Sequence, residues 1–439
     1  MHPSETTKKT KSGLNISDVA TTFLSTKLTP GAPQIRAFCE GVGVGAIRGA
    51  LTMAVLSALL LIAARPAQAQ TETVLYNFTG GSDGGDPQSS LTPGDGNFYG
   101  VTADGGAFGA GTVFELSPNG GGGWNEAVLY SFTGGADGLY PESYLIFDGA
   151  GNLYGTTASG GVYGWGTVFE LSPAGASWTE TVLHSFSGED GDCGQPTAGL
   201  IMDKTGDLFG ESSDCMGGKG LHGTVFQLTP SPSGWTEQTI YSGLYISSTP
   251  GLTMDAAGNI FGTSRPMVFE LSPNGSGGWN STRIFRGAHR AVGAPVLDQA
   301  GHVYGATTLG GANGLGRVYR LTLGKKGWTR KTLYSFKGGA DGSYPYAGVV
   351  LDAAGNIYGT TGYGGQSGYG TVFELVAPVG KGSYQERVLW SFNGTDGLNP
   401  TGSLILDGAG SLYGVTRVGG SAWRQGVFSG YGVVFEVTP

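Results

Sequence analysis

An aromatic–glycine pair recurs seven times along this chain, and it restricts the possible folds more than any other feature of the sequence. The pairs are Tyr99-Gly100, Tyr154-Gly155, Phe209-Gly210, Phe261-Gly262, Tyr304-Gly305, Tyr358-Gly359 and Tyr413-Gly414. Successive pairs are separated by 43 to 55 residues, and self-similarity at a nearly fixed period is the signature of a repeat protein. The sequence therefore predicts seven copies of one structural unit.

The second unit shows most clearly what one repeat contains. Segments rich in β-branched and aromatic residues alternate with Gly, Pro, Asp and Asn, and they predict strands at 144–147, 153–157, 167–171 and 178–186. The segment 148–152 carries Asp and Gly, which suits a tight hairpin turn. Four antiparallel strands in a repeat of this length are typical of a β-propeller blade.

The two ends of the repeat region indicate how the array is closed. Residues 73–78 match the fourth strand of a unit, whereas 403–406, 412–416 and 433–437 match only the first three. Pairing 73–78 with 433–437 completes the last unit and leaves no open sheet edge, whereas an open solenoid would need polar caps. We therefore predict an all-β fold over residues 70–439. It is a seven-bladed propeller of four-stranded antiparallel blades, and this pairing closes its ring.

The first 69 residues differ from the repeats. An apolar run of 16 residues at 49–64 follows Arg48 and precedes Ala67-Gln68-Ala69, a small-x-small pattern for signal peptidase. The run is short for a helix that crosses a bilayer, so it favours a signal peptide over a retained membrane anchor. We predict an N-terminal extension and signal peptide at 1–69, no C-terminal anchor, and export to the extracellular space, the cell surface or the periplasm.

Charge and cysteine content narrow the possible partners. Beyond residue 69 the chain has 17 Lys and Arg against 30 Asp and Glu, a net charge of -13. Such a surface argues against nucleic acid as a partner and repels anionic polymers unless the charge is locally reversed. Two cysteines remain, Cys193 and Cys215, and in an exported protein they predict a disulfide, with two free thiols as the alternative. We expect a monomer without cofactor or metal that leaves the membrane after signal cleavage.

Two motifs within the repeats resemble those of a known family. GTVFEL occurs at 111–116, 166–171 and 370–375, and GNLYGTT and GNIYGTT occur at 151–157 and 355–361. These motifs are similar to the GloVer tandem repeat of exported bacterial proteins, and the resemblance covers residues 72–439. It implies export and a repeat architecture, and it implies no established activity.

Candidate ligand contacts come from loops that a propeller places on one face. The connections from the fourth strand to the next unit, and from the second strand to the third, emerge on the same side. Six aromatic residues in the latter connections are our candidates: Tyr163, Trp165, Tyr363, Tyr369, Trp423 and Tyr431. Flat rings beside short carboxylates suit sugars, so the expected partner is a polysaccharide or a protein. The alternative is that these rings pack on glycine-rich backbone.

Candidate catalytic residues lie in units three to five, which depart most from the repeat. Asp214, His222 and Arg290 could perform acid–base chemistry on a polysaccharide, although drift of a redundant repeat explains the same residues more simply. Zinc-protease, serine-hydrolase, phosphate-loop and dinucleotide motifs are absent from the sequence. The sequence favours a non-enzymatic binding module over two alternatives, a carbohydrate-active hydrolase or lyase and a purely structural envelope protein.

Overall fold

The computed structural model describes residues 70–189, 191–213, 223–244, 251–287, 290–425 and 429–438. The predicted N-terminal extension and signal peptide lie outside these residues, and the repeat region belongs to one compact unit, Ala69–Pro439. The described residues contain one short helix, the 3₁₀ turn η1 (Gly339–Asp341), and no helix long and apolar enough to cross a membrane.

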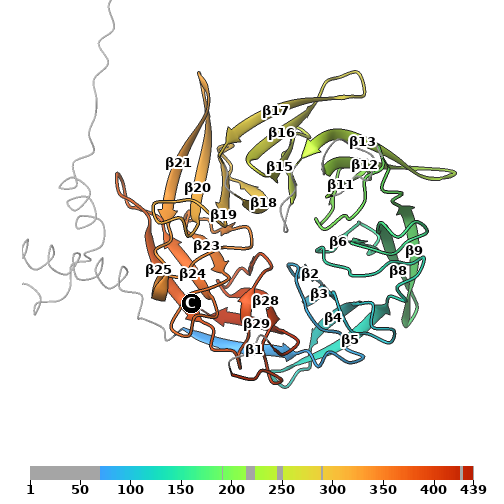
Figure 1. Ribbon diagram of the computed structural model, residues 1–439, viewed down its shortest axis with the longest axis horizontal. Coiled ribbons are helices and arrows are strands. Elements are labelled where there is room, and N and C mark those ends of the chain that lie inside the picture. Colours follow the sequence, from blue (N-terminus) through green and yellow to red (C-terminus); the bar gives the residue numbers. More distant parts are fainter. Residues whose placement is uncertain are drawn as a thin grey trace, which may run out of the picture. The chain divides into compact units, whose positions relative to one another are not determined.

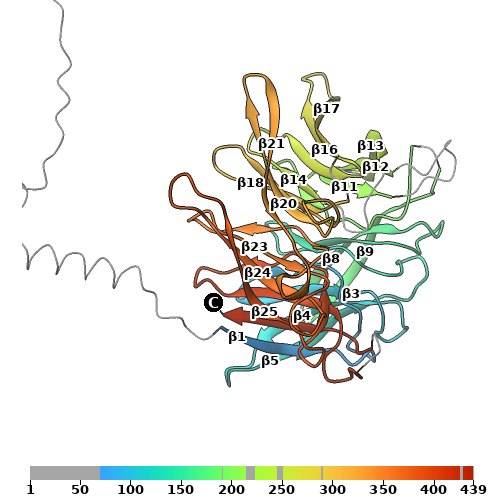
Figure 2. The ribbon, with the colours of Figure 1, turned by 60° about the vertical axis from the view of Figure 1, so that its left-hand side comes forward.

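Seven antiparallel sheets follow one another in chain order around a ring (Figure 1). We number the blades from one to seven along the chain and call their strands first to fourth from the centre outwards. Blade one consists of β2 (Thr92–Gly94), β3 (Asn97–Thr102), β4 (Thr112–Pro118) and β5 (Trp124–Ser131). Blade two consists of β6 (Ile146–Phe147), β7 (Leu153–Thr157), β8 (Thr167–Ala174) and β9 (Ser177–Ser185). Blade three consists of β10 (Ile201–Met202), β11 (Leu208–Ser212), β12 (Gly223–Ser231) and β13 (Gly234–Leu244). Blade four consists of β14 (Leu252–Met254), β15 (Ile260–Ser264), β16 (Met267–Pro273) and β17 (Trp279–Arg286). Blade five consists of β18 (Ala291–Leu297), β19 (Val303–Thr307), β20 (Arg317–Gly324) and β21 (Gly327–Ser335). Blade six consists of β22 (Val350–Leu351), β23 (Ile357–Thr361), β24 (Thr371–Val376) and β25 (Gln385–Ser391). In Figure 2 the hairpins β16–β17 and β20–β21 extend at the top of the view.

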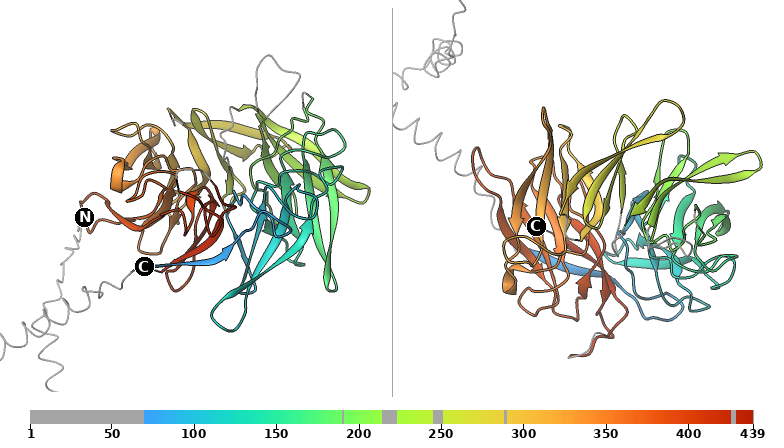
Figure 3. Two further views of the ribbon diagram at one scale, coloured as in Figure 1. Left: turned by 60° about the horizontal axis from the view of Figure 1, so that its bottom comes forward. Right: turned by 45° about the horizontal axis from the view of Figure 1, so that its top comes forward.

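The seventh blade joins the two ends of the repeat region, as the sequence predicts. It contains β26 (Leu398–Pro400), β27 (Ile405–Leu406), β28 (Leu412–Val418) and β29 (Val433–Thr438), with β1 (Thr71–Asn77) as its outermost strand. β1 runs antiparallel to β29, from the pair Thr71 and Thr438 to the pair Asn77 and Val433, as the left panel of Figure 3 shows. This pairing closes the ring, so the predicted all-β seven-bladed propeller is confirmed.

The hydrophobic core is distributed over the seven junctions between neighbouring blades. The Phe of each VFEL motif is fully buried, and an added Cβ on the strand-two glycine would meet its ring, at 2.6 Å for Gly155 and Phe169. The repeated glycine is therefore required by a close approach of ring and backbone. The Trp residues that open the fourth strands pack on the preceding blade, for example Trp279 on Phe209 and Trp328 on Phe261.

Hydrogen bonds near the ring's centre link each blade to the next. Thr92 Oγ1 donates to the Leu145 carbonyl at 2.5 Å, and Thr156 Oγ1 donates to the Pro196 carbonyl at 2.9 Å. The Ser403 N–H donates to Ser90 Oγ at 2.9 Å across the junction of blades seven and one. These contacts fix the spacing of the first strands around the centre of the ring.

Candidate functional site

One face of the ring carries the crossovers between blades and the connections between second and third strands, and we call it the loop face. The two kinds of loop are held together by short antiparallel bridges, including Gly85 with Asp104 and Ser343 with Tyr363. The predicted arrangement of these loops on a single face is therefore present.

Exposed aromatic side chains gather on this loop face. Among the described residues, the large aromatics with the most exposure are Phe108, Tyr140, Tyr163, Tyr363 and Tyr431. All five come from crossovers or second-to-third-strand connections, and Tyr163 reaches 61% exposure. The remaining exposed large apolar residues are aliphatic. Among the residues that the structure describes, exposed aromatic side chains are thus confined to the loop face.

The six predicted ligand contacts divide into two groups. Tyr163, Tyr363 and Tyr431 are exposed, whereas Trp165, Tyr369 and Trp423 are half-buried. An added Cβ on Gly188 or Gly194 would lie 2.7 Å or 2.5 Å from Trp165, and one on Gly394 would lie 2.4 Å from Trp423. These two tryptophans therefore cover crossover glycines.

Residues that carry these rings also hold the crossovers in place through hydrogen bonds of their backbone carbonyl groups. The Trp165 carbonyl accepts the N–H of Gln195 at 2.7 Å, and the Tyr369 carbonyl accepts the N–H of Asn399 at 2.9 Å. The Tyr431 carbonyl accepts the N–H of Asp86 in the same way. Tyr431 differs from Trp165 and Tyr369 in its exposure. One side of its ring covers Gly80 and Gly85, but the residue remains 45% exposed.

The residue that ends each described crossover has an unusual backbone conformation. Asp86, Tyr140, Gln195, Arg290, Tyr344 and Asn399 have φ between 53° and 58°. All but Arg290 precede a proline, which also disfavours this conformation. Glycine would adopt it without strain, so this glycine-rich chain retains side chains there at an energetic cost.

A cavity of about 200 Å³ lies between the first strands of six blades. Its walls are formed mostly by small residues such as Ser89, Thr197, Ala294 and Ala347, and Glu142 is the charged side chain among its lining residues. Burial raises the pKa of Glu142, the nearby Asp86 raises it further, and Arg417 opposes this rise. Arg417 itself forms an ion pair with Asp86, with Nε 2.9 Å from Oδ1.

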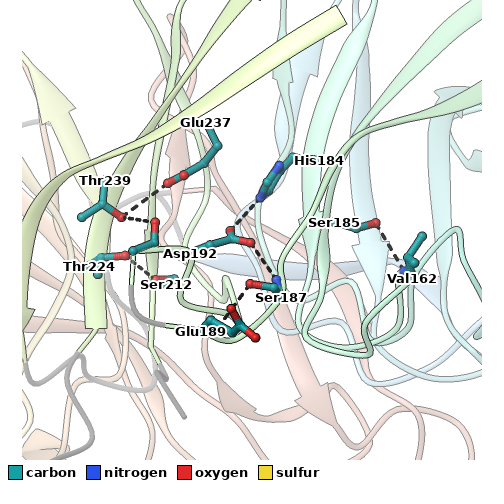
Figure 4. A network of polar contacts seen from close by, with 11 residues as sticks. Val162, His184, Ser185, Ser187, Glu189, Asp192, Ser212, Thr224, Glu237 and Thr239 are labelled. Atoms are coloured by element: carbon teal, nitrogen blue, oxygen red, sulfur yellow. Dashed lines mark hydrogen bonds and ion pairs between the residues drawn. The ribbon is translucent and has the colours of Figure 1, made fainter. Parts of the chain in front are cut away.

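Five blade junctions contain one repeated polar arrangement. An aromatic side chain of a fourth strand donates to the crossover Asp, as Tyr130 does to Asp137 at 3.1 Å and Trp390 to Asp396 at 3.1 Å. The same Asp accepts the N–H at the start of the crossover, for example from Thr133 at 2.7 Å. At the junction of blades two and three, the crossover aspartate is Asp192, which lies 2.7 Å from the ring nitrogen of His184 (Figure 4). The crossover carboxylates are therefore structural.

A glutamate of the next blade approaches each of these aspartates. The five glutamates are Glu72, Glu126, Glu180, Glu237 and Glu386, all half-buried on fourth strands. Burial and then the crossover Asp raise their pKa, to about 7 for Glu126, Glu180 and Glu237 and to about 8 for Glu72 and Glu386. We did not foresee these pairs, because the two carboxylates come from different repeats. The repeated Trp-x-Glu at the start of the fourth strands is the signal that could have revealed them.

The candidate catalytic set is described only in part. Arg290 ends the crossover between blades four and five, and Asp214 and His222 lie outside the described residues. Cys193 is buried, and because Cys215 also lies outside the described residues, the disulfide stays a prediction. Within the described part of the chain, no group of three or more His, Cys, Asp or Glu could hold a metal ion.

Comparison with protein families assigns the repeat. The model of the Gloeobacter/Verrucomicrobia repeat matches residues 62–268 and 264–439, which together make up most of the chain. The chain belongs to this Gloeobacter/Verrucomicrobia repeat family. The match confirms the resemblance drawn from GTVFEL and GNLYGTT. A search of curated proteins found no match to this member of the family.

Solved structures with the same fold have different roles. An ancestral GH74 enzyme matches with a TM-score of 0.55 and 13% identity, over 80% of this chain and 48% of that one. The extracellular domain of a hybrid two component system from B. thetaiotaomicron matches with 0.51 and 12%, over 84% and 41%. A protein from Lactobacillus plantarum matches with 0.50 and 11%, over 80% and 100%. This repeat-family chain thus spans less than half the length of the first two, and the likeness shows the fold alone.

Proposed function

We propose that this chain is an exported, non-enzymatic binding module whose loop face binds a glycan. The observation that carries the proposal is the confinement of all five exposed aromatic side chains of the described residues to that face. Exposed aromatic surface costs free energy in water, so its repeated presence on one face favours a binding role.

The geometry of the exposed rings favours a sugar ligand over a flat protein surface. Tyr431 rests one side on Gly80 and Gly85, so the opposite side is a supported platform for the C–H face of a sugar ring. Tyr163 lies in a glycine-rich connection and Tyr363 meets Tyr344 edge-on at 6.0 Å between ring centroids. Tyr163, Tyr363 and Tyr431 belong to loops of blades two, six and seven, so each ring can contact a different part of a polysaccharide.

Export is part of the same proposal. The apolar run at 49–64 with Ala67-Gln68-Ala69 supports cleavage before Gln70, which would leave residues 70–439 as a secreted or surface-bound propeller domain. The fold is shared with a domain that is itself extracellular, which agrees with this location. A monomer that uses no cofactor completes the proposal.

A glycan array and polysaccharide pull-downs with the purified protein test the function. Tyr163→Ala and Tyr431→Ala should each weaken binding about tenfold, because each removes one stacking platform. Val379→Ala is the matched control, since Val379 is fully exposed in the turn between β24 and β25 on the opposite face. Retention of full binding by both tyrosine variants would contradict the proposed site.

We do not propose a catalytic function. Arg290 is the one candidate catalytic residue that the structure describes, and the His184–Asp192 pair between blades two and three repeats the Tyr–Asp contact of other junctions. This equivalence accounts for the polar network in Figure 4 without chemistry on a substrate.

A further inference from the structure

The positive charge of this acidic protein is concentrated in one sector. Eleven of the 17 Lys and Arg beyond residue 69 lie within 265–337, together with only two acidic residues. This segment, which runs from the end of β15 through β21, therefore carries a net charge of +9 in a chain of net charge -13. It covers the outer part of blade four and all of blade five, adjacent blades in Figure 1.

The cations of this sector are not neutralised within the described part of the protein. No ion pair there joins any of the eleven to a carboxylate, and Arg283, Arg286, Arg330 and Lys331 are exposed on the outer strands β17 and β21. Arg320 faces Lys331 directly across the β20–β21 pair, a like-charge contact that destabilises a sheet. Blade six places Glu374 and Arg387 at the equivalent positions, with a 2.9 Å ion pair.

The junction between blades four and five departs from the polar arrangement of the other five. Phe285 stands where Tyr130 stands in blade one, and the crossover sequence from Gly287 to Arg290 contains no Asp. Arg330 occupies the position that Glu126 and its equivalents hold. The guanidinium carbon of Arg330 lies 4.7 Å from the centroid of the Phe285 ring. Basic side chains at this junction thus occupy the positions of the acidic side chains at the other junctions.

A second arginine converges on the same ring. Arg317 replaces the Thr found at this position in four other blades, and its guanidinium carbon lies 5.9 Å from the Phe285 centroid. Arg317 is only 7% exposed; Nη2 donates to the Gly287 carbonyl at 2.9 Å, while Nε has no hydrogen-bond partner among the described residues. Burial, and then Arg330, lowers the pKa of Arg317. Two guanidinium groups therefore repel each other where the other junctions hold a carboxylate.

We propose that this junction binds the anionic groups of an acidic polysaccharide, a glycan chain that carries carboxylate or sulfate groups. Arg317 and Arg330 bind one anionic group beside Phe285, and the exposed cations of β17 and β21 contact the next groups along the chain. A thin linear chain can follow this strip, whereas a nucleic acid duplex or an acidic protein would also meet the negatively charged flanking blades. The site is separate from the loop-face aromatics, so it does not depend on the function proposed for them.

Binding of alginate, dextran sulfate and neutral dextran to the purified protein, measured over a series of salt concentrations, tests the proposal. The variants restore residues that other blades already use, namely Arg330→Glu and Arg317→Thr. We expect alginate or dextran sulfate to bind, with affinity that falls as salt rises, and Arg330→Glu to weaken binding about a hundredfold. Arg424→Glu makes the same charge change at an exposed site on blade seven and should change binding less than threefold. Urea unfolding of each variant verifies that the fold is retained.

Each outcome decides the proposal. Binding of alginate alone assigns carboxylate groups to the ligand, binding of dextran sulfate alone assigns sulfate groups, and both support the site. The site is refuted if neither polymer binds at low salt, if Arg330→Glu and Arg424→Glu weaken binding equally, or if neutral dextran binds as tightly. Polyadenylate serves as a competitor, and displacement of the polysaccharide at equal charge concentration would overturn the assignment to a glycan.

Discussion

Replacing Glu180 by Gln should stabilise the propeller at alkaline pH and have little effect at acidic pH. Glu180 is half-buried, its Oε1 has no hydrogen-bond partner within the described segments, and burial followed by the nearby Asp137 raises its pKa from 4.5 to about 7. Because the folded-state pKa is raised, the stability that Glu180 contributes is present below its ordinary pKa and is lost as pH rises through about 7. Gln carries no charge to desolvate, so the variant avoids this loss.

The magnitude follows from the size of the pKa shift. A shift from 4.5 to about 7 corresponds to about 3 kcal/mol without screening, and solvent around a half-exposed side chain reduces this to about 1 kcal/mol. Urea unfolding at about pH 5 and about pH 8.5 measures the difference. Glu180→Gln should gain about 1 kcal/mol at the higher pH and close to nothing at the lower.

A second variant in the same carboxylate pair should behave in the opposite way. Burial acts to raise the pKa of Asp137, but hydrogen bonds from Thr133 and Tyr130 outweigh it and lower the pKa. Asp137→Asn therefore should lose about 1 kcal/mol at neutral pH, because it weakens these bonds. An equal effect of Glu180→Gln at both pH values would refute the assignment of the pH dependence to this pair.

The remaining predictions concern packing. Gly155→Ala would bring its Cβ to 2.6 Å from Phe169, so we expect a loss of about 2 kcal/mol in urea unfolding, and unchanged stability would contradict the close approach. Trp165→Ala should lower the free energy of unfolding by about 2 kcal/mol because it uncovers two crossover glycines, whereas Tyr163→Ala should change it by less than about 0.5 kcal/mol. Equal losses would show that the difference in exposure between these two side chains does not determine their contributions to stability. Glu211 is fully buried, and burial holds its pKa well above 4.5, although the Gly251 N–H acts to lower it. Glu211→Thr, which introduces the residue that three other blades use, should gain about 1 kcal/mol at about pH 8, and a loss there would refute this account.

The fold could be predicted because its determinants are local and repeated. Each strand has its own pattern of β-branched and aromatic residues, and incomplete units at both ends predict the closure between β1 and β29. Seven copies of one pattern average out the irregularities of any single repeat. Even the short first strands, which are paired over only two residues in β6, follow the expected order.

The sites were harder to predict because they depend on contacts between repeats. Trp165 and Tyr163 are two residues apart in the same loop, yet only the structure separates them, since Trp165 meets the next crossover and Tyr163 does not. Glu180 and Asp137 are likewise remote in sequence and belong to different units. In the crossover between blades two and three, the Asp-Gly pattern of the other crossovers occurs at residues 190–191. The carboxylate that contacts His184 and the Ser187 N–H is nevertheless that of Asp192.

Closure of the ring by β1 has a consequence for the order of folding. β1 is the first strand of the propeller to be synthesised, but its partner β29 ends at Thr438, so the first strand made is among the last to be paired. Blades one to six can form from neighbouring segments, whereas the seventh must bring together residues separated by the whole ring, which is slow because of the long loop it closes. Until β29 has been made, the edge of β1 that pairs with it remains unpaired. Late closure therefore leaves an unpaired strand edge in the incompletely folded chain, and such an edge can pair with another molecule.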